Sequence, residues 1–206
     1  MNASSLPLFP LNTVLFPDGV LPLQIFEVRY LDMINKCIAN GTAFGVVALT
    51  QGSEVRKPGA TETIAAVGTM ARIVESSAPM PGLLHIVSQG ATRFRITSSV
   101  QLKTGLWMAE VTAIDNDQVV DIPDELQNTA DALGKLIASL QGDGVPVKEM
   151  PLAAPYRLDE CGWVANRWSE LLPLPVSQKQ QLLELDNPVL RLELIQDVLG
   201  EQGLLA

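Results

Sequence analysis

The residues that could support catalysis do not form a recognised catalytic pattern. Residues 86–90 (IVSQG) come nearest to a serine-hydrolase nucleophile elbow, but they lack the first glycine of Gly-x-Ser-x-Gly. Gly134-Lys135 is followed by Leu136, and Thr129 stands where a phosphate-binding loop needs its first glycine. The sequence encodes neither motif, and we expect no enzymatic activity and no ATP hydrolysis.

Histidine and cysteine are too scarce for a zinc site. His85 is the single histidine, and Cys37 and Cys161 are the two cysteines, with no Cys-x-x-Cys pair. A structural zinc ion takes four such ligands, so we expect no metal or other cofactor. His85 lies in the apolar run LLHIV, which favours a hydrogen-bonded core or edge position in a strand. Both cysteines are interpreted as buried and reduced.

Two groups of charged residues remain as candidate sites near the N-terminus and in the middle of the chain. The first is the segment FEVRY, with Glu27, Arg29 and Tyr30, at the junction of a loop and a helix. Its position favours a role in tethering that junction. The second group comprises three arginines at strand-like positions: Arg72, Arg93 and Arg95.

The charge of the chain changes sharply after residue 120. Residues 1–120 carry 8 Lys and Arg against 9 Asp and Glu, whereas residues 121–206 carry 6 against 14. Nucleic-acid binders usually show a clear basic stripe, so we interpret the three arginines as solvated strand residues. The asymmetry also indicates two units of different character.

The elements that must position these residues begin with the stretch Leu6–Tyr30, LPLFPLNTVLFPDGVLPLQIFEVRY. Its four prolines exclude a helix and predict short extended segments joined by tight turns. They also interrupt every apolar run, so the stretch does not fit a signal peptide. No run approaches the roughly 18 apolar residues of a membrane span. We therefore expect a cytoplasmic protein that does not enter a membrane.

The next part of the chain is predicted to be rich in strands. Residues 26–39 form a helix that buries Val28, Leu31, Ile34 and Ile38 and stops at Asn40-Gly41. Strands are expected at residues 44–50, 62–76, 83–89, 92–100 and 106–114. Gly90-Ala91 is predicted to link two of them, and the Pro-Met-Pro-Gly segment at residues 79–82 to form a turn.

From Asp121 the apolar spacing becomes helical. Helices are expected at residues 121–140 and 159–172, after a Ser177–Gln180 capping box, and after Asn187 with Pro188 in the first turn. The last helix is predicted to present Leu190, Leu194, Ile195 and Val198 and to stop at Gly200. These helices form a small bundle.

Segments along nearly the whole chain, in this order, resemble the N-terminal substrate-binding domain of the Lon protease family. They are LPLFPL, VLFP, LPL, IFEVRY, FGVV, VGTMARI and HIVSQGATRFRI in the strand-rich part, and ANRWSELLPLP and KQQLLEL in the helical part. The chain looks closest to short bacterial members in which this domain stands alone, without the ATPase and peptidase parts.

The resemblance implies an α+β fold: a strand-rich, PUA-like pseudo-barrel at residues 1–118, followed by a helical bundle at residues 119–206. It also implies a non-enzymatic module that binds exposed apolar segments of polypeptides or a partner protein. Phe9, Phe16 and Phe26 are the candidate contact residues. RNA binding is the alternative, suggested by the PUA-like fold and the three arginines, although a nucleic-acid partner is not the leading expectation.

Overall fold

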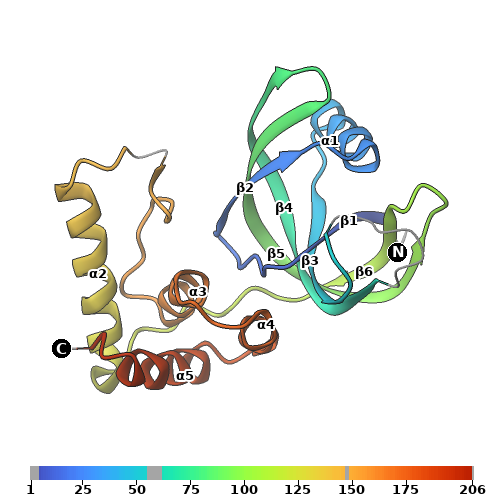
Figure 1. Cartoon of the computed structure of the whole chain (residues 1–206). Helices are drawn as coiled ribbons and strands as arrows, with labels where there is room; N and C mark the ends of the chain where they lie inside the picture. The colour runs from blue at the N-terminus through green and yellow to red at the C-terminus, as the bar shows by residue number, and fades with distance from the viewer. Residues whose placement is uncertain (1–4, 55–61, 147–148, 206) are drawn as a thin grey trace. The chain divides into compact units, whose positions relative to one another are not determined.

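The computed structural model describes residues 5–54, 62–146 and 149–205, which form two compact units (Figure 1). The first unit spans Met1–Asn116 and the second Asp117–Ala206. All of the described strands and one helix belong to the first unit, and the other helices belong to the second. The predicted α+β class is therefore confirmed.

The strands of the first unit form one sheet. They are β1 (Ser5–Leu11), β2 (Val20–Ile25), β3 (Phe44–Gln51), β4 (Thr63–Met80), β5 (Leu83–Gln101) and β6 (Trp107–Ala113). Their order is β2-β5-β4-β3-β1-β6, and β5 also pairs with β6. The last five strands of this order thus close into a ring, a pseudo-barrel as expected, in which only β1 and β3 are parallel.

β4 and β5 are longer than the ring requires. β3 pairs with β4 as far as Ala71, and β6 pairs with β5 from Phe94 onwards. The remaining parts, residues 72–80 of β4 and residues 83–91 of β5, pair with each other, and β2 pairs with β5 alone. We call this three-stranded extension the arm; its hairpin is drawn in green at the top of Figure 1.

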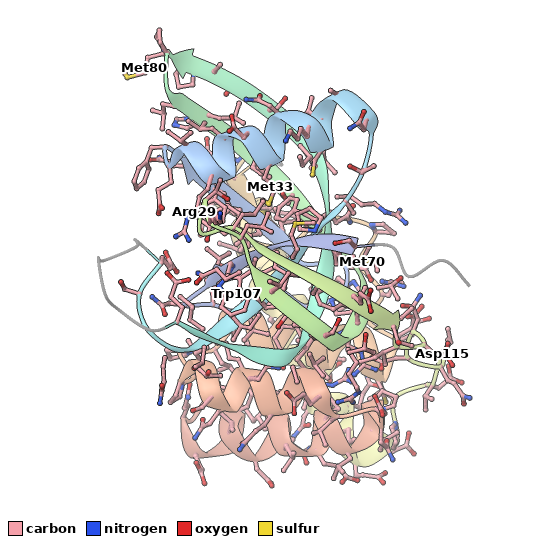
Figure 2. The ribbon with its side chains drawn as sticks, turned by 90° about the vertical axis from the view of Figure 1, so that its right-hand side faces the viewer. Arg29, Met33, Met70, Met80, Trp107 and Asp115 are labelled. Atoms are coloured by element: carbon pink, nitrogen blue, oxygen red, sulfur yellow. The ribbon has the colours of Figure 1, made fainter. Side chains whose placement is uncertain are left out.

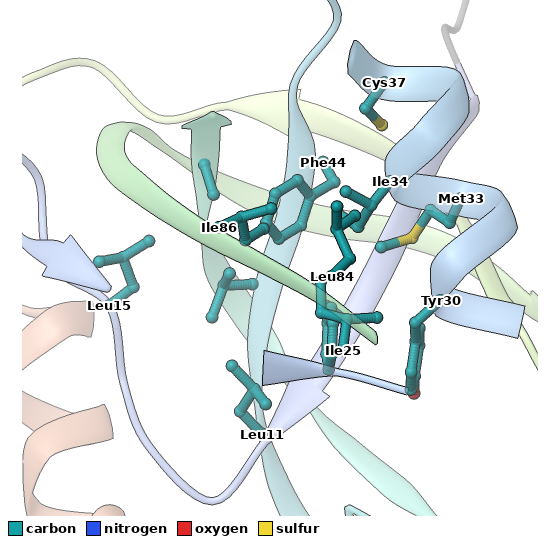
Figure 3. Close-up of a cluster of buried hydrophobic side chains, with 13 residues drawn as sticks. Leu11, Leu15, Ile25, Tyr30, Met33, Ile34, Cys37, Phe44, Leu84 and Ile86 are labelled. Atoms are coloured by element: carbon teal, nitrogen blue, oxygen red, sulfur yellow. The ribbon is translucent and has the colours of Figure 1, made fainter. Parts of the chain in front are cut away.

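Helix α1 (Val28–Asn40) packs against the arm through a cluster of buried side chains (Figure 3). The helix contributes Tyr30, Met33, Ile34 and Cys37, and the strands contribute Phe9, Leu11, Ile25, Phe44, Val46, Ala71, Leu84 and Ile86, with Leu15 from the β1–β2 connection. The helix ends at Gly41, whose φ of 62° confirms the predicted stop. Aromatic and aliphatic side chains from six elements thus form one core.

The predicted apolar face of α1 is wrong at both ends. Val28 and Ile38 are exposed, whereas Arg29 is buried. The helix is rotated from the expected face because Arg29 finds hydrogen-bond partners inside the first unit, and a paired guanidinium can replace an apolar side chain there.

The prediction of a link at Gly90-Ala91 is also wrong, because β5 continues through both residues. Gly90 is needed for a close approach: a Cβ built there would lie 2.1 Å from the Phe16 carbonyl oxygen. Asp18 N–H donates to the Gly90 carbonyl at 2.9 Å, and Gly90 N–H donates to the Gly19 carbonyl at 2.8 Å. The glycine therefore lets the proline-rich β1–β2 connection lie against the sheet.

The second unit contains helices. They are the short 3₁₀ helix η1 (Asp124–Leu126), α2 (Gln127–Gly142), α3 (Cys161–Leu171), α4 (Val176–Glu184) and α5 (Pro188–Glu201). The predicted Asn187 cap is confirmed, since its side chain accepts from the N–H groups of Val189 and Leu190. The Ser177 capping box is wrong: α4 begins at Val176, after Pro175, without a side-chain cap, so Ser177 lies inside the helix.

The buried face of α5 differs from the prediction. Ile195 is buried as expected, but Leu190 and Leu194 are exposed, and Arg191, Leu192 and Leu199 face the core. A buried arginine shifts the face that apolar spacing alone selects. Among the described helices, none has the length and apolar character needed to cross a membrane.

Candidate polypeptide-binding surface

The structure separates the three candidate phenylalanines. Phe9 and Phe16 are buried, and the Phe9 ring stacks on Tyr30 with a centroid distance of 4.0 Å. Phe26, in contrast, keeps 59% of its surface exposed. Of the three, Phe26 alone presents its side chain to a ligand in this conformation.

Phe26 lies beside the tip of the arm. It follows Ile25, the last residue of β2, which pairs with Leu84 of β5. The preceding residue of β5, Leu83, pairs with Met80 at the end of β4. The register therefore brings Phe26, Met80 and Leu83 to the same end of the arm, and we call these three residues the arm tip.

The arm tip is apolar and open. Residues 75–82 are all exposed, and Met80 keeps 59% of its surface accessible. Figure 2 shows Met80 at the outer end of the hairpin, beyond α1. An unbranched thioether adapts to partners of different shape. Apolar spacing does not single out Met80, but the Pro-Met-Pro-Gly turn could have, because such a turn exposes whatever residue it carries at a hairpin end.

The outer edge of β2 is poorly suited to accept another strand. In this antiparallel pair, successive residues of β2 direct their backbone N–H and C=O groups alternately toward β5 and toward the open edge. Gly19 pairs with β5, because its carbonyl accepts from Gly90 N–H. The backbone groups of Val20, Pro22 and Gln24 therefore point to the open edge. Pro22 has no N–H to donate there. The outer edge of β2 therefore favours contacts through side chains over the addition of another strand.

A shallow pocket of about 440 Å³ lies on the outer face of the arm. Gln24, Glu75, Ser77 and His85 line it, and Gln24 and Ser77 flank His85 in the sheet register. His85 is in a strand, as expected, but its buried Nε2 has no hydrogen-bond partner among the described residues. The predicted hydrogen-bonded histidine is thus only half right.

The Glu27–Arg29–Tyr30 cluster tethers the start of α1, as predicted. Arg29 Nε donates to Glu27 Oε2 at 3.0 Å, and Arg29 Nη1 donates to the Gly105 carbonyl at 2.7 Å. The guanidinium carbon lies 4.5 Å from the centre of the Tyr30 ring. Glu62 lies 3.9 Å from Arg29 Nη1 and accepts from Trp107 Nε1 at 3.2 Å. The cluster links α1 to the β5–β6 turn (Figure 2).

Burial shifts the pKa of four side chains toward the neutral form. Burial raises the pKa of the Tyr30 hydroxyl and of the Cys37 and Cys161 thiols. Both cysteines are buried and unpaired with each other, as expected. Burial also lowers the pKa of Lys179, whose Nζ donates to the Glu170 carbonyl at 2.8 Å. A raised thiol pKa is opposite to what a cysteine nucleophile needs.

The three arginines do not form the predicted solvated set. Arg72 and Arg95 are exposed, but Arg93 is buried. A phosphate-binding face built from all three is therefore not present on the surface. Groups of three or more His, Cys, Asp or Glu residues that could hold a metal ion do not occur within the described ranges.

Comparison with known proteins identifies relatives along almost the whole chain. The model of the family described as the ATP-dependent protease La (LON) substrate-binding domain matches residues 5–201. Lon protease of Anaeromyxobacter dehalogenans is 30% identical over 201 residues, which is 96% of this chain and 23% of that protein. Lon protease 2 of Myxococcus xanthus is 29% identical over 202 residues, with 96% and 24% covered. The chain thus spans about a quarter of the length of these curated relatives.

Two solved structures have the same architecture. The Lon N-terminal domain protein from Xanthomonas campestris is 32% identical, with a TM-score of 0.75, and the match covers 94% of this chain and 98% of that one. The N-terminal domain of a Mycobacterium avium complex Lon protease gives a TM-score of 0.63 over 96% and 99% of the two chains. At 19% identity, the second match shows likeness of fold alone.

Proposed function

The chain belongs to the family of Lon substrate-binding domains, and on this premise we propose that it binds exposed apolar segments of polypeptides at the arm tip. The module acts by recognition and carries out no chemistry itself. Its partners are unfolded polypeptide segments or a protein that presents such a segment. We also propose that the protein functions in the cytoplasm and uses no cofactor.

The observation that carries this proposal is the exposure of Phe26 and Met80 at one end of the arm. Single exposed apolar residues are common on protein surfaces and need no explanation. Here a phenyl ring and a flexible thioether from separate segments lie at the same end of the arm as Leu83, on a sheet backed by the α1 cluster. An aromatic anchor on a rigid support is typical of residues that dominate binding energy.

The composition of the arm tip also fits a ligand of varied sequence. Residues 76–83 (SSAPMPGL) carry no charged side chain, so no specific ion pair is demanded of a partner. Proline at positions 79 and 81 limits pairing of the hairpin with a second strand. The surface therefore favours apolar side chains without selecting one backbone conformation.

Titration of the protein into a fluorescein-labelled, permanently unfolded polypeptide, such as reduced and carboxymethylated lactalbumin, tests the proposal. We expect saturable binding, weakened about fivefold by Phe26→Ser or Met80→Ser because each removes buried apolar area from the complex. Val100→Ser is the matched control, since Val100 is 58% exposed on β5 outside the arm. Absence of saturation at tens of micromolar protein, or equal effects of Val100→Ser and Phe26→Ser, would remove the proposal.

RNA binding gains no support from these observations. Arg93 is buried, and the relatives and structures described above are named as Lon proteins or their N-terminal domains. A gel-shift measurement with structured RNA at low salt, where phosphate contacts are strongest, is expected to show no complex.

A further inference from the structure

The helical unit has an apolar groove that its own side chains leave open. The groove has a volume of about 470 Å³, within the range of roughly 300–1,000 Å³ for ligand sites. Its apolar lining consists of Ala132 and Leu136 of α2, Trp168 and Leu171 of α3, and Leu172, Pro173 and Leu204 from the segments that follow α3 and α5. We call it the α2–α3 groove; α2, α3 and the C-terminal end of α5 can be located in Figure 1.

The floor and one wall of the groove are rigid. Trp168 is buried, and its Nε1 donates to the Thr129 carbonyl at 2.9 Å, which fixes the indole against α2. Gln196 Nε2 donates to Asn128 Oδ1 at 2.8 Å and to the Glu125 carbonyl at 2.6 Å. The start of α2 is therefore fastened to α5, and the groove exists before a ligand arrives.

Leu204 is held in place by the backbone and yet left uncovered. Gly203 has a φ of 67°, and the N–H of Leu204 donates to the Leu199 carbonyl at 2.9 Å. This is the Schellman arrangement at the end of a helix, in which the residue after the glycine packs on the last turn. Leu204 still exposes 49% of its surface at the groove, so part of this side chain is free for contact with a ligand.

The groove belongs to a strongly acidic unit. Residues 117–206 contain 15 Asp and Glu against 6 Lys and Arg, and Arg167 and Arg191 are buried among those six. Asp131 lines the groove, Glu125 lies two residues before the start of α2, and Glu201 directly precedes the lining residue Gln202; all three are exposed. Lys135 is the one basic residue in the described lining. The net negative charge of the unit therefore favours a positively charged ligand.

The walls of the groove also select the conformation of its occupant. They are made by helices and helix ends, whose backbone groups are used within the helices, and no strand edge lines them. An extended chain would find no backbone partners there, whereas a helix satisfies its own and inserts side chains at i, i+3, i+4 and i+7. We therefore infer that the α2–α3 groove binds a cationic amphipathic helix of a polypeptide, leucine-like side chains inward and Lys or Arg at the rim. This site rests on the proposed function only in that its ligand is also a polypeptide.

Fluorescence anisotropy with three labelled peptides tests the inference on the full chain. One peptide has Leu at helical spacing and Lys on its other face, one has Glu in place of Lys, and one keeps Lys but has Ser in place of Leu. We expect the Leu-Lys peptide to bind most tightly and to gain helical circular dichroism on binding. Leu204→Ser and Asp131→Lys are each expected to weaken it about fivefold.

Matched controls separate the groove from the general properties of the surface. Leu194→Ser removes a comparably exposed leucine, 41% accessible, from α5 outside the groove lining. Glu193→Lys changes the net charge by the same amount as Asp131→Lys, but at an exposed position on α5 that does not line the groove. Neither control is expected to change affinity by more than about twofold.

Distinct outcomes decide the two proposals. Equal binding of the Lys and Glu peptides, equal effects of a groove variant and its control, or no binding of the Leu-Lys peptide each overturns the groove inference. None of these results tests the arm tip, because that proposal depends on binding of the unfolded polypeptide and on the effect of Phe26→Ser. Conversely, if the arm tip does not bind the unfolded polypeptide, peptide binding that depends on Leu204 still supports the groove.

Discussion

Arg191 and Asp117 form a nearly buried ion pair that joins helix α5 to the start of the second unit. Arg191 Nη1 lies 2.6 Å from Asp117 Oδ2, and the two side chains retain 1% and 14% exposure. The same guanidinium donates to Asn166 Oδ1 at 2.9 Å and to the Leu182 and Leu185 carbonyls. One side chain thus satisfies acceptors on four residues of the helical unit: Asp117, Asn166, Leu182 and Leu185.

Removing the arginine is expected to be costly. Arg191→Met keeps most of the aliphatic bulk but leaves the Asp117 carboxylate without this buried cation, which we expect to lower the free energy of unfolding by about 3–5 kcal/mol. Arg157→Met is the control, because Arg157 is 37% exposed and pairs with Glu160 at 3.4 Å on the surface. That change should cost less than about 1 kcal/mol. Urea denaturation followed by tryptophan fluorescence measures both; similar losses would contradict the assignment.

The ion pair explains one limit of prediction from this sequence. Apolar spacing located α5 and its Asn187 cap, because both depend on residues near one another in the chain. The buried face could not be predicted in the same way, because the partner of Arg191 lies 74 residues away. A charged residue is assigned to the surface until its distant partner is known.

Gly90 illustrates the same limit for the sheet. A Gly-Ala pair between two apolar runs predicts a turn, and that interpretation divided one long strand into two. The glycine is instead required by the Phe16 carbonyl, which comes from a distant part of the chain. For the candidate site, the sequence pointed to phenylalanines of the proline-rich stretch, but the folded sheet was needed to show which one is exposed.

Gly90→Ala is expected to destabilise the first unit. The added methyl group would meet the Phe16 carbonyl oxygen at 2.1 Å, so either the β1–β2 connection or β5 must move. Overpacking of this kind typically costs about 1–3 kcal/mol, and contact with backbone should place the cost at the upper end. Thermal unfolding followed by circular dichroism gives the loss.

Gly142→Ala serves as the comparison for Gly90→Ala. A Cβ at Gly142 has no atom within 4 Å at the end of α2, so this variant should match the wild type or gain up to about 1 kcal/mol. If Gly90→Ala unfolds at the same temperature as Gly142→Ala, the close approach does not constrain the fold.

The stability of the protein should fall at alkaline pH, in part through Tyr30. Burial raises the pKa of this hydroxyl above its ordinary value of 10.0, so the folded state holds the proton after the unfolded state has lost it. The contribution of the protonated Tyr30 hydroxyl to the free energy of unfolding is fully present below pH 10 and is lost as the pH rises further. The Cys37 and Cys161 thiols act in the same direction from about pH 9, because burial also raises their pKa.

Tyr30→Phe isolates the tyrosine in this pH dependence. The variant retains the ring that stacks on Phe9, and the cysteines and Lys179 contribute equally to both proteins. Above pH 10, the free energy of unfolding of the wild type should fall more steeply with pH than that of Tyr30→Phe, whereas the two slopes should agree between pH 6 and about pH 8. Parallel curves above pH 10 would show that the hydroxyl titrates alike in both states.

The three phenylalanines should differ in what their removal costs. Phe9→Ala and Phe16→Ala remove buried rings and are expected to lower the free energy of unfolding by about 3–5 kcal/mol each. Phe26→Ala removes an exposed ring and should change stability by no more than about 0.5 kcal/mol. Urea denaturation tests stability, and the titration with unfolded polypeptide tests binding. A stable Phe26→Ala variant with weakened binding assigns this ring to the ligand, whereas a large loss of stability would assign it to the fold along with Phe9 and Phe16.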